Sequence, residues 1–335
     1  MVRNTGGRTI GKQVEGRSLK ELERTCLVGV GRVRHVDHDV RPAERFGQTI
    51  PGENSNSEKK KRIRQAIIGA GHVGRVLGRL FAGVEGIAVQ DVLTRSMDSA
   101  RAAVAFIGAG RPVDGYAALR RADVTMLAVS DDQIVPACAA LVAEGRQAGA
   151  IVFHCSGALA SNLLRVATQA GASVASVHPI RSFADPGQVA ASFDGTYCGV
   201  EGDALAMTFL TPALIAIGAR PVPIDAAAKT LYHAAAVFAS NYLVTVLDAS
   251  LRAWQAAGIP EAVARELAGP LVTETVANVL RLGAAPALTG PVARGDMATV
   301  ARQQQAVAQW DTATGDLYAA LVAPTMALAA RKRAL

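Results

Sequence analysis

The sequence is poor in aromatic residues and in cysteine. The first shortage limits the composition of its core, and the second argues against a metal-binding or disulfide-stabilised protein. Only 4% of the 335 residues are aromatic while half are hydrophobic, so a core must consist mainly of Ala, Val, Leu and Ile. The length is sufficient for two domains. The cysteines lack the spacing of metal ligands or of a CxxC pair, so we predict no metal site, no disulfide framework and a reducing, cytoplasmic location. They are Cys26, Cys138, Cys155 and Cys198.

The chain also lacks an uninterrupted apolar run of the roughly 18–20 residues that cross a bilayer. Its most apolar long stretch, Leu231 to Leu247, contains His233, Ser240 and Asn241. We therefore interpret this stretch as a buried helix and expect no membrane span. The first 61 residues lack the apolar segment of a secretory signal.

The net charge of the chain is +7, but most of the chain has no net charge. Residues 1–64 hold 15 Lys and Arg against 8 Asp and Glu, whereas residues 65–335 hold 20 of each. The neutral part argues against a nucleic-acid-binding domain. We predict that residues 1–61, which are polar and without sustained periodicity, form a basic disordered extension. Partner or nucleic-acid binding by this extension is the open alternative.

The clearest motif that is present runs from Gln65 to Gly78 and reads QAIIGAGHVGRVLG. A short apolar run precedes three glycines, and apolar residues at helical spacing follow, which indicates strand, glycine turn and helix. The first glycine permits the tight turn, the second lets a pyrophosphate approach, and the third packs helix on strand. Free N–H groups of the new helix then hold the diphosphate. The predicted dinucleotide-binding residues are Gly69, Gly71, His72, Val73 and Gly74.

The end of the next strand, at residues 87–93, decides which dinucleotide fits. The adenosine ribose lies there in this architecture, and NAD-specific proteins place an acidic residue beside it. Here Arg95 and Ser96 follow the strand, which suits the 2′-phosphate of NADP. Asp91 is the acidic competitor but lies inside the strand. We predict NADP(H), the alternative being that Arg95 is a solvated loop residue.

Strand and helix patterns alternate over residues 62–224 and then give way to long Ala-rich helices. The alternation predicts an α/β fold, a doubly wound and mostly parallel Rossmann-type sheet, followed by an all-helical second domain at 225–330. The expected strands are 64–68, 87–93, 123–129, 150–153, 173–177, 196–200 and 220–224. The expected long helices are 226–257, 260–282 with a possible kink at Pro270, and 296–330 with an interruption near Pro324.

Polar residues follow several predicted strands, at the sheet edge where ligands bind in such folds. We predict Ser130 and Ser156 near the nicotinamide and His178 among the catalytic residues. Pro179 restricts the backbone of His178 and so fixes its imidazole. Arg181 is predicted to bind an anionic substrate. The structural alternatives are a core histidine and a surface arginine.

Lys229, His233 and Asn241 lie at i, i+4 and i+12 of the first long helix, within an arc of about 120°. A lysine can donate a proton to a carbonyl as hydride arrives, and His or Asn can position that carbonyl. Structural hydrogen bonding is the alternative. Further on, Arg294 in ALTGPVARGD is predicted to bind a carboxylate, or else to belong to a structural turn before a helix capped by Asp296.

The order of these motifs resembles a bacterial family of Rossmann-like proteins that carry the domain of unknown function 2520, over about residues 62–325. The motifs are GAGHVG, the TRS strand end, AVSDDQI, HCSGAL, SVHPIRSF, YCGVEGD, LYHAAAVFASNYL and ALTGPVARGD. The resemblance implies a Rossmann fold, an NADP cofactor and oxidoreductase activity. One departure is Gln303–Gln305, where relatives tend to carry a histidine.

A more distant resemblance joins the chain to 6-phosphogluconate dehydrogenase, 3-hydroxyisobutyrate dehydrogenase, ketopantoate reductase and pyrroline-5-carboxylate reductase. In the first three, a helix of the second domain carries a lysine and, four residues later, an asparagine. Lys229 matches the lysine, whereas His233 stands at the asparagine position. This substitution weakens any transfer of a particular substrate.

Two functional hypotheses follow from the sequence. The first is an NADP-dependent oxidoreductase that transfers a hydride to or from a small carbonyl, imine or hydroxy acid, with Lys229 or His233 as proton donor. Analogy adds a homodimer formed through the helical domain. The second is a non-catalytic NADP-binding sensor or scaffold, since no complete catalytic constellation is recognisable.

Overall fold

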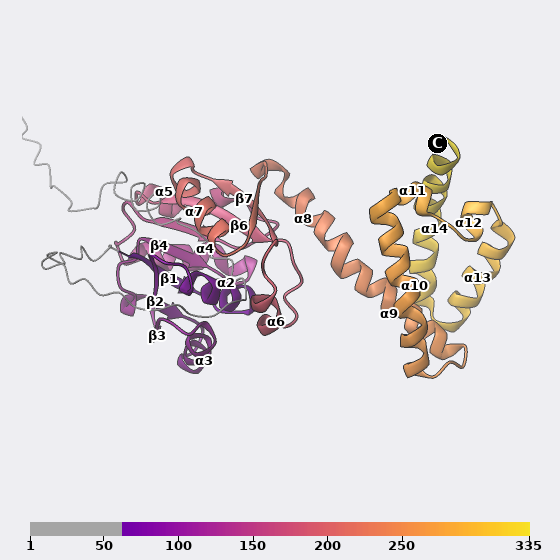
Figure 1. The fold of residues 1–335 in the computed structure, drawn as a ribbon, viewed down its shortest axis with the longest axis horizontal. Coiled ribbons are helices and arrows are strands. Elements are labelled where there is room, and N and C mark those ends of the chain that lie inside the picture. Colours follow the sequence, from indigo (N-terminus) through magenta and orange to yellow (C-terminus); the bar gives the residue numbers. More distant parts are fainter. Residues whose placement is uncertain (1–61) are drawn as a thin grey trace, which may run out of the picture. The chain divides into compact units, whose positions relative to one another are not determined.

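The computed structural model describes residues 62–335 and contains two compact units, one ending at Ala236 and the other beginning at Val237 (Figure 1). The extension predicted at 1–61 lies outside the described residues. The domain boundary expected at 224/225 falls just before helix α8 (Lys229–Val237), at the end of which the two units divide.

The first unit is built on one eight-stranded sheet of order β3-β2-β1-β4-β5-β6-β7-β8. All neighbouring strands are parallel except β6 and β7. The strands are β1 (Ile63–Ile68), β2 (Ile87–Leu93), β3 (Arg111–Val113), β4 (Val124–Leu127), β5 (Ile151–His154), β6 (Ser173–Pro179), β7 (Tyr197–Gly202) and β8 (Arg220–Pro223). The order reverses between β1 and β4, which is the switch point where such sheets bind ligands.

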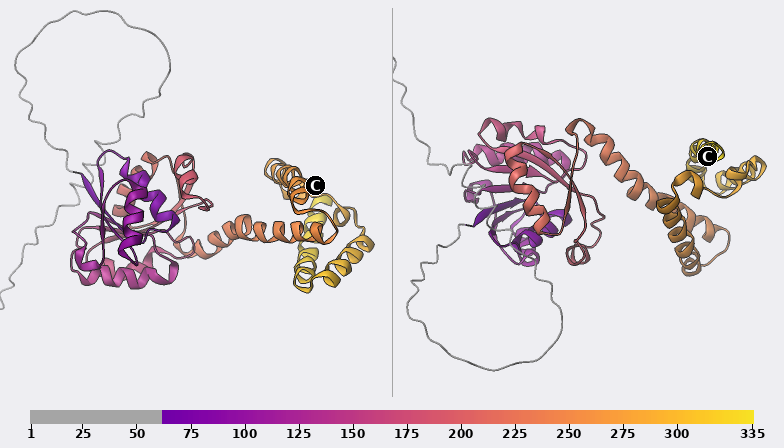
Figure 2. Two further views of the ribbon diagram at one scale, coloured as in Figure 1. Left: turned by 90° about the horizontal axis from the view of Figure 1, so that it is seen from below. Right: turned by 45° about the horizontal axis from the view of Figure 1, so that its top comes forward.

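Helices cover both faces of this sheet, which confirms the predicted doubly wound fold (Figure 2). Apolar side chains of α2, α3, α6 and α7 fill the core on one face, and those of α4 and α5 fill the core on the other. The helices are α2 (His72–Ala82), α3 (Met97–Ile107), α4 (Ile134–Ala143), α5 (Arg165–Gln169), α6 (Pro186–Ala191) and α7 (Ala204–Ala216).

Strand β3 is the one addition to the predicted sheet among the described residues. It has three residues, lies at the sheet edge and contains Pro112, which lacks the N–H needed in a central strand. A segment this short carries no apolar alternation to reveal it.

The second unit is entirely helical over its described residues, as the sequence predicts. A π-helical turn, Phe238–Tyr242, continues α8 into α9. The helices are α9 (Leu243–Ala256), α10 (Glu261–Leu282), α11 (Ala284–Ala287), α12 (Pro291–Arg294), α13 (Met297–Trp310) and α14 (Thr312–Arg333).

The predicted interruption near Pro324 was wrong, since α14 runs through this proline and the break falls at Asp311. Asp311 is extended, and its carboxylate accepts hydrogen bonds from Arg252 at 3.2 Å and from Thr314. A Cβ at Gly315 would lie 2.6 Å from the Cα of Ala308, so the two helices meet very closely at the turn. Packing and capping at Asp311, rather than proline, therefore end α13. Helix α10 likewise continues through Pro270.

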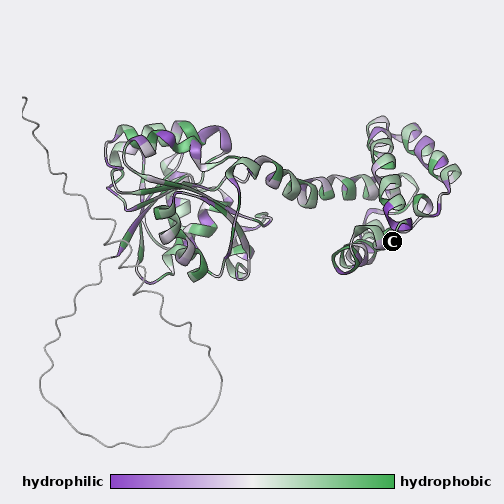
Figure 3. Cartoon of the chain, turned by 90° about the horizontal axis from the view of Figure 1, so that it is seen from above, coloured by the Kyte–Doolittle hydropathy of each residue, from purple (hydrophilic) through white to green (hydrophobic). Residues whose placement is uncertain are grey.

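Two helices of the described residues, Ala226–Ala256 and Thr312–Arg333, are long and apolar enough to cross a membrane by length and composition alone. The 18-residue window of the first has a mean hydropathy of 1.4, and none of it is buried. Figure 3 shows hydrophobic residues along the helices of the second unit. This exposed apolar surface contradicts the expectation that the stretch from Leu231 to Leu247 is buried within the chain.

The glycine turn allows a stability prediction with an internal control. A Cβ at Gly74 would lie 2.7 Å from the carbonyl oxygen of Gly69, whereas a Cβ at Gly71 would meet nothing within 4 Å. We expect Gly74→Ala to lower the free energy of unfolding by about 1–3 kcal/mol, because helix α2 must move off the strand. Gly71→Ala should unfold like the wild type. Urea denaturation followed by circular dichroism measures both, and equal stabilities of the two variants would contradict the packing role of Gly74.

Candidate functional site

The glycine turn connects β1 to α2 at the switch point of the sheet. Gly69 has a φ of 82°, and a Cβ there would lie 2.5 Å from the carbonyl oxygen of Ala128. Gly71 is exposed, with open space where its Cβ would be. The first and third glycines thus meet the protein's own backbone, while the second leaves room for a ligand.

The N-terminus of α2 is free to bind an anion. Within residues 62–335, no protein acceptor is hydrogen bonded to the backbone N–H groups of Gly71, His72 or Val73, and no acidic residue lies in the first turn. The Nδ1 atom of His72 lies 2.5 Å from the carbonyl oxygen of Phe183, which ties the loop before α6 to this turn. These features fit the predicted diphosphate site.

Asp91, inside β2, is unavailable to a ligand. Its carboxylate is fully buried and accepts hydrogen bonds from Arg111 at 3.1 Å and from Arg120 at 2.8 Å. Burial alone would raise the pKa of Asp91, but the hydrogen bonds from Arg120 and Arg111 outweigh it and hold the pKa below its usual value. Asp91 is therefore a structural carboxylate.

Arg95 and Ser96 lie beyond the strand and are exposed. The hydroxyl oxygen of Ser96 accepts a hydrogen bond from the Ser99 N–H and so caps α3. No ion pair or hydrogen bond of the Arg95 guanidinium occurs among residues 62–335. This end of β2 thus presents an uncommitted cation.

The hydroxyl of Ser156 is already committed inside the protein. It donates to the Asp131 carboxylate at 3.0 Å and accepts from the N–H groups of Ala158 and Leu159. Ser156 is buried, whereas Ser130, before the 3₁₀ turn Asp131–Gln133, is exposed. The turn after β5 is therefore a rigid element that can offer backbone, not the serine hydroxyl, to a ligand.

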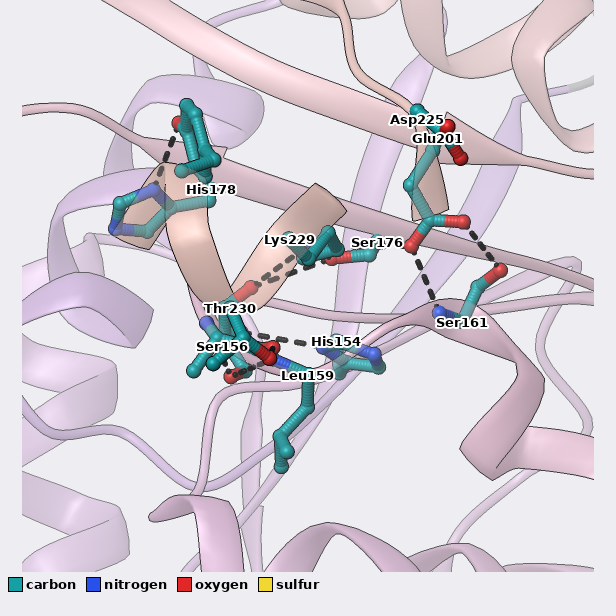
Figure 4. Close-up of polar contacts among 12 residues, drawn as sticks. His154, Ser156, Leu159, Ser161, Ser176, His178, Glu201, Asp225, Lys229 and Thr230 are labelled. Carbon is teal, nitrogen blue, oxygen red and sulfur yellow. Dashed lines mark hydrogen bonds and ion pairs between the residues drawn. The ribbon is translucent and has the colours of Figure 1, made fainter. Parts of the chain in front are cut away.

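Lys229 begins α8 with a side chain that is only 1% exposed. Its ammonium donates to the carbonyl oxygen of Ser156 at 2.9 Å and to the hydroxyl of Ser176, and lies 4.0 Å from the Glu201 carboxylate (Figure 4). Glu201 in turn accepts from the N–H and the hydroxyl of Ser161, both at 2.7 Å. Burial lowers the pKa of Lys229, while Glu201 acts in the opposite direction. Two of the three ammonium N–H groups are thus hydrogen bonded inside the protein, and the side chain that carries them is buried.

Three residues from separate segments meet beside the Ser156 turn. The imidazoles of His178 and His233 lie with centroids 5.4 Å apart at 73° to one another. A Cβ at Gly157 would overlap the His233 ring and lie 2.8 Å from the Nε2 atom of His178. Burial, with His233 and Lys229 nearby, lowers the pKa of His178 to about 4. The structure thus places two of the predicted catalytic residues around a glycine backbone.

The other predicted residues are placed differently. Arg181 donates to the Ser192 carbonyl, to the Ser192 hydroxyl at 2.6 Å and to Thr196 at 3.2 Å, so its guanidinium anchors the loop after β6. Asn241 lies exposed in the π-helical turn, and Arg294 lies exposed at the end of α12. Both belong to the second unit, and their roles stay predictions. Among residues 62–335, no group of three His, Cys, Asp or Glu could hold a metal ion.

Sequence reasoning missed two residues of this site, Glu201 and Tyr232. Glu201 is the charged residue of an otherwise uncharged strand, YCGVEG, which is a signal for a buried partner. Tyr232 stands next to His233, and its hydroxyl lies 3.0 Å from Nδ1 of His178. Its helical spacing from Lys229, i+3, places both on one face.

Comparisons with solved structures found many similar folds. BF3122 from Bacteroides fragilis, assigned provisionally as an NADP oxidoreductase, is 20% identical with a TM-score of 0.67, covering 79% of this chain and 98% of that one. The protein TM1727 from Thermotoga maritima is 25% identical with a TM-score of 0.61, covering 80% and 99%. A reductive aminase from Aspergillus terreus, solved with NADPH and ethyl levulinate, is 15% identical with a TM-score of 0.57, covering 79% and 92%.

Comparisons with curated proteins gave no match. Models of protein families gave two, a Rossmann-like domain over residues 49–179 and the domain of unknown function DUF2520 over residues 196–325. These are the two parts that the order of the sequence motifs indicates. The chain therefore carries a Rossmann-like domain followed by a DUF2520 domain.

Proposed function

We propose that this protein is an NADP-dependent oxidoreductase that transfers a hydride to or from a small carbonyl, imine or hydroxy acid. The observation that carries the proposal is the pairing of an open glycine turn at β1 with an uncommitted arginine at the end of β2. The similar fold of the Aspergillus terreus reductase, which was solved with NADPH, supports the choice of cofactor.

The residues around the switch point suit NADP(H) better than NAD(H). The backbone from Gly69 to Gly74 would hold the diphosphate, and Arg95 with Ser96 would hold the 2′-phosphate. Asp91 is the acidic residue that could hydrogen bond the 2′-hydroxyl of NAD(H), but its carboxylate is ion-paired with Arg111 and Arg120. Ser130 and the backbone of the Ser156 turn would lie beside the nicotinamide ring. When bound, NADP(H) would supply or accept the hydride at this ring.

For proton transfer we assign the main role to His233, with His178 beside it. His233 lies one helical turn after Lys229, and its ring contacts the Gly157 backbone. The side chain is partly exposed, so a ligand can reach it. Lys229 has the charge for a proton donor but not the freedom, because its ammonium is buried among Ser156, Ser176 and Glu201. Asn241 and Arg294 are retained as substrate-binding candidates from the second unit.

Nucleotide titration tests the cofactor assignment. We expect the wild type to bind NADPH more tightly than NADH, and Arg95→Ala to weaken NADPH binding roughly 10- to 100-fold while leaving NADH unchanged, since a hydrogen bond to a charged group contributes about 1.5–3 kcal/mol. Nicotinamide fluorescence gives the Kd values.

Arg101→Ala is the matched control, because Arg101 is an exposed arginine of α3 paired with Asp98. Equal losses for the two variants would contradict a 2′-phosphate site at Arg95. Tight NADPH binding without turnover of any keto acid or imine would favour the alternative of a non-catalytic sensor or scaffold.

The buried lysine gives a second test. Lys229→Met should lower the free energy of unfolding by about 3–5 kcal/mol, because Glu201 would remain buried without its cation. Adding Glu201→Gln should restore part of the loss. Chemical denaturation measures all three proteins, and a Lys229→Met variant of full stability that has lost only turnover would return the proton-donor role to Lys229.

We further propose that the protein is a soluble cytoplasmic homodimer formed through its second unit. Helix α10 has 22 residues, of which Ala264 alone is buried, and it exposes Leu271 by 57% and Leu280 by 82%. An exposed apolar surface of this kind is typical of a protein–protein interface. In a two-fold symmetric dimer, the same helices of a second copy would bury it. The same dimer contact would account for the apolar composition of Ala226–Ala256 and α14, the two helices long and apolar enough to cross a membrane.

Sedimentation tests the dimer. The wild type should sediment at twice the 34.7 kDa of one chain, and Leu271→Glu with Leu280→Glu should sediment as a monomer. Arg265→Gln, an exposed change on the same helix, should leave the dimer intact. A monomeric wild type at micromolar concentration would contradict this proposal, and recovery only in detergent would point to a membrane.

A further inference from the structure

Tyr232 occupies a fixed position over His178. Its hydroxyl oxygen lies 3.0 Å from Nδ1 of the imidazole, and the two rings meet edge to face with centroids 5.6 Å apart. Tyr232 stands in the first turn of α8, three residues after the buried ammonium of Lys229. The network that anchors Lys229 therefore also fixes where the phenol lies.

Gly199 makes room for this phenol. It pairs with His178 across the antiparallel strands β6 and β7, so it lies directly beside the histidine. A Cβ at Gly199 would overlap the Tyr232 hydroxyl and the Ile224 side chain. Burial raises the pKa of Tyr232 to about 12. The phenol thus rests against the strand that carries Gly199.

The protonation states of Tyr232 and His178 indicate which of the two side chains donates the hydrogen bond between them. Tyr232 keeps its hydroxyl proton at neutral pH, and His178 is neutral because burial lowers its pKa to about 4. Among residues 62–335, Nδ1 of His178 is the hydrogen-bond partner of the Tyr232 hydroxyl, and no other acceptor is in reach of it. The hydroxyl therefore donates to Nδ1, and the single imidazole proton resides on Nε2.

We propose that Tyr232 is a positioning residue that holds His178 as its neutral Nε2–H tautomer. The Nε2 edge lies beside Gly157, where a Cβ would approach it to 2.8 Å, and no protein acceptor among the described residues is bonded to it. The histidine thus offers an N–H donor at the glycine backbone. That this N–H would donate a hydrogen bond to a substrate's carbonyl oxygen or imine nitrogen rests on the proposed function.

A donor of this kind differs from an imidazolium. Neutral imidazole polarises a carbonyl without carrying a charge, and its N–H persists across the pH range in which an ordinary histidine titrates. Lys229 and His233 are the charged and titratable groups that face it, and both disfavour a positive His178. The tautomer is consequently set by Tyr232 rather than by pH.

The tautomer is measured directly by long-range ¹H–¹⁵N correlation on the full chain labelled at histidine nitrogen, without nucleotide. A His178→Gln variant identifies the signals. We expect the wild type to show Nε2 as the protonated nitrogen and Nδ1 as the unprotonated one. Tyr232→Phe, which removes only the hydroxyl, should bring the two ¹⁵N shifts together as the tautomers interchange.

Tyr242→Phe is the control, because Tyr242 is an exposed tyrosine of the second unit. A wild-type His178 protonated at Nδ1, or a Tyr232→Phe spectrum identical to the wild type, would overturn the proposal. Because this readout needs neither NADPH nor substrate, its failure is distinct from a failure of the oxidoreductase assignment. Given turnover, Tyr232→Phe should lower kcat while the Kd for NADPH stays unchanged.

Discussion

The buried ammonium of Lys229 is the interaction on which the described site depends. A cation removed from water is tolerated only when its hydrogen bonds are satisfied and an anion is near. Here its partners come from three parts of the sheet: the turn after β5, strand β6 and strand β7. The first turn of α8 is thereby fixed against all three. Tyr232 and His233, three and four residues further along that helix, inherit their positions beside His178 and Gly157.

The strand, glycine turn and helix at the proposed cofactor end could be predicted from the sequence because their signals are local. The glycine turn and the TRS strand end each occupy a few consecutive residues, and the structure gives the glycines distinct environments. Asp91 could not be judged in the same way, since its carboxylate is neutralised by Arg111 and Arg120, 20 and 29 residues away. Only the folded sheet shows that this acid, close to the proposed ribose position, is already paired with two arginines.

The chemical end was less predictable, for the same physical reason. Helical spacing placed Lys229 and His233 on one face, but spacing does not reveal burial, and the partners of Lys229 lie 53 and 73 residues away in sequence. The antiparallel pairing of β6 with β7 is also invisible in the alternation of strands and helices. That pairing sets Gly199 beside His178 and so admits Tyr232. His178 was predicted, whereas its hydrogen-bond partner was not.

The antiparallel pair also bears on how this chain divides into modules. The Rossmann-like match ends at residue 179, the last residue of β6, and the DUF2520 match begins at residue 196, just before β7. The boundary between the two matched segments therefore runs through a continuous sheet. Glu201 on one side of it holds Ser161 and faces Lys229, so each segment contains atoms that the other requires for its own buried polar groups. A chimaera joined at this boundary would leave buried polar groups without partners unless both segments kept them, so the boundary between the two sequence matches is not a boundary between folding units.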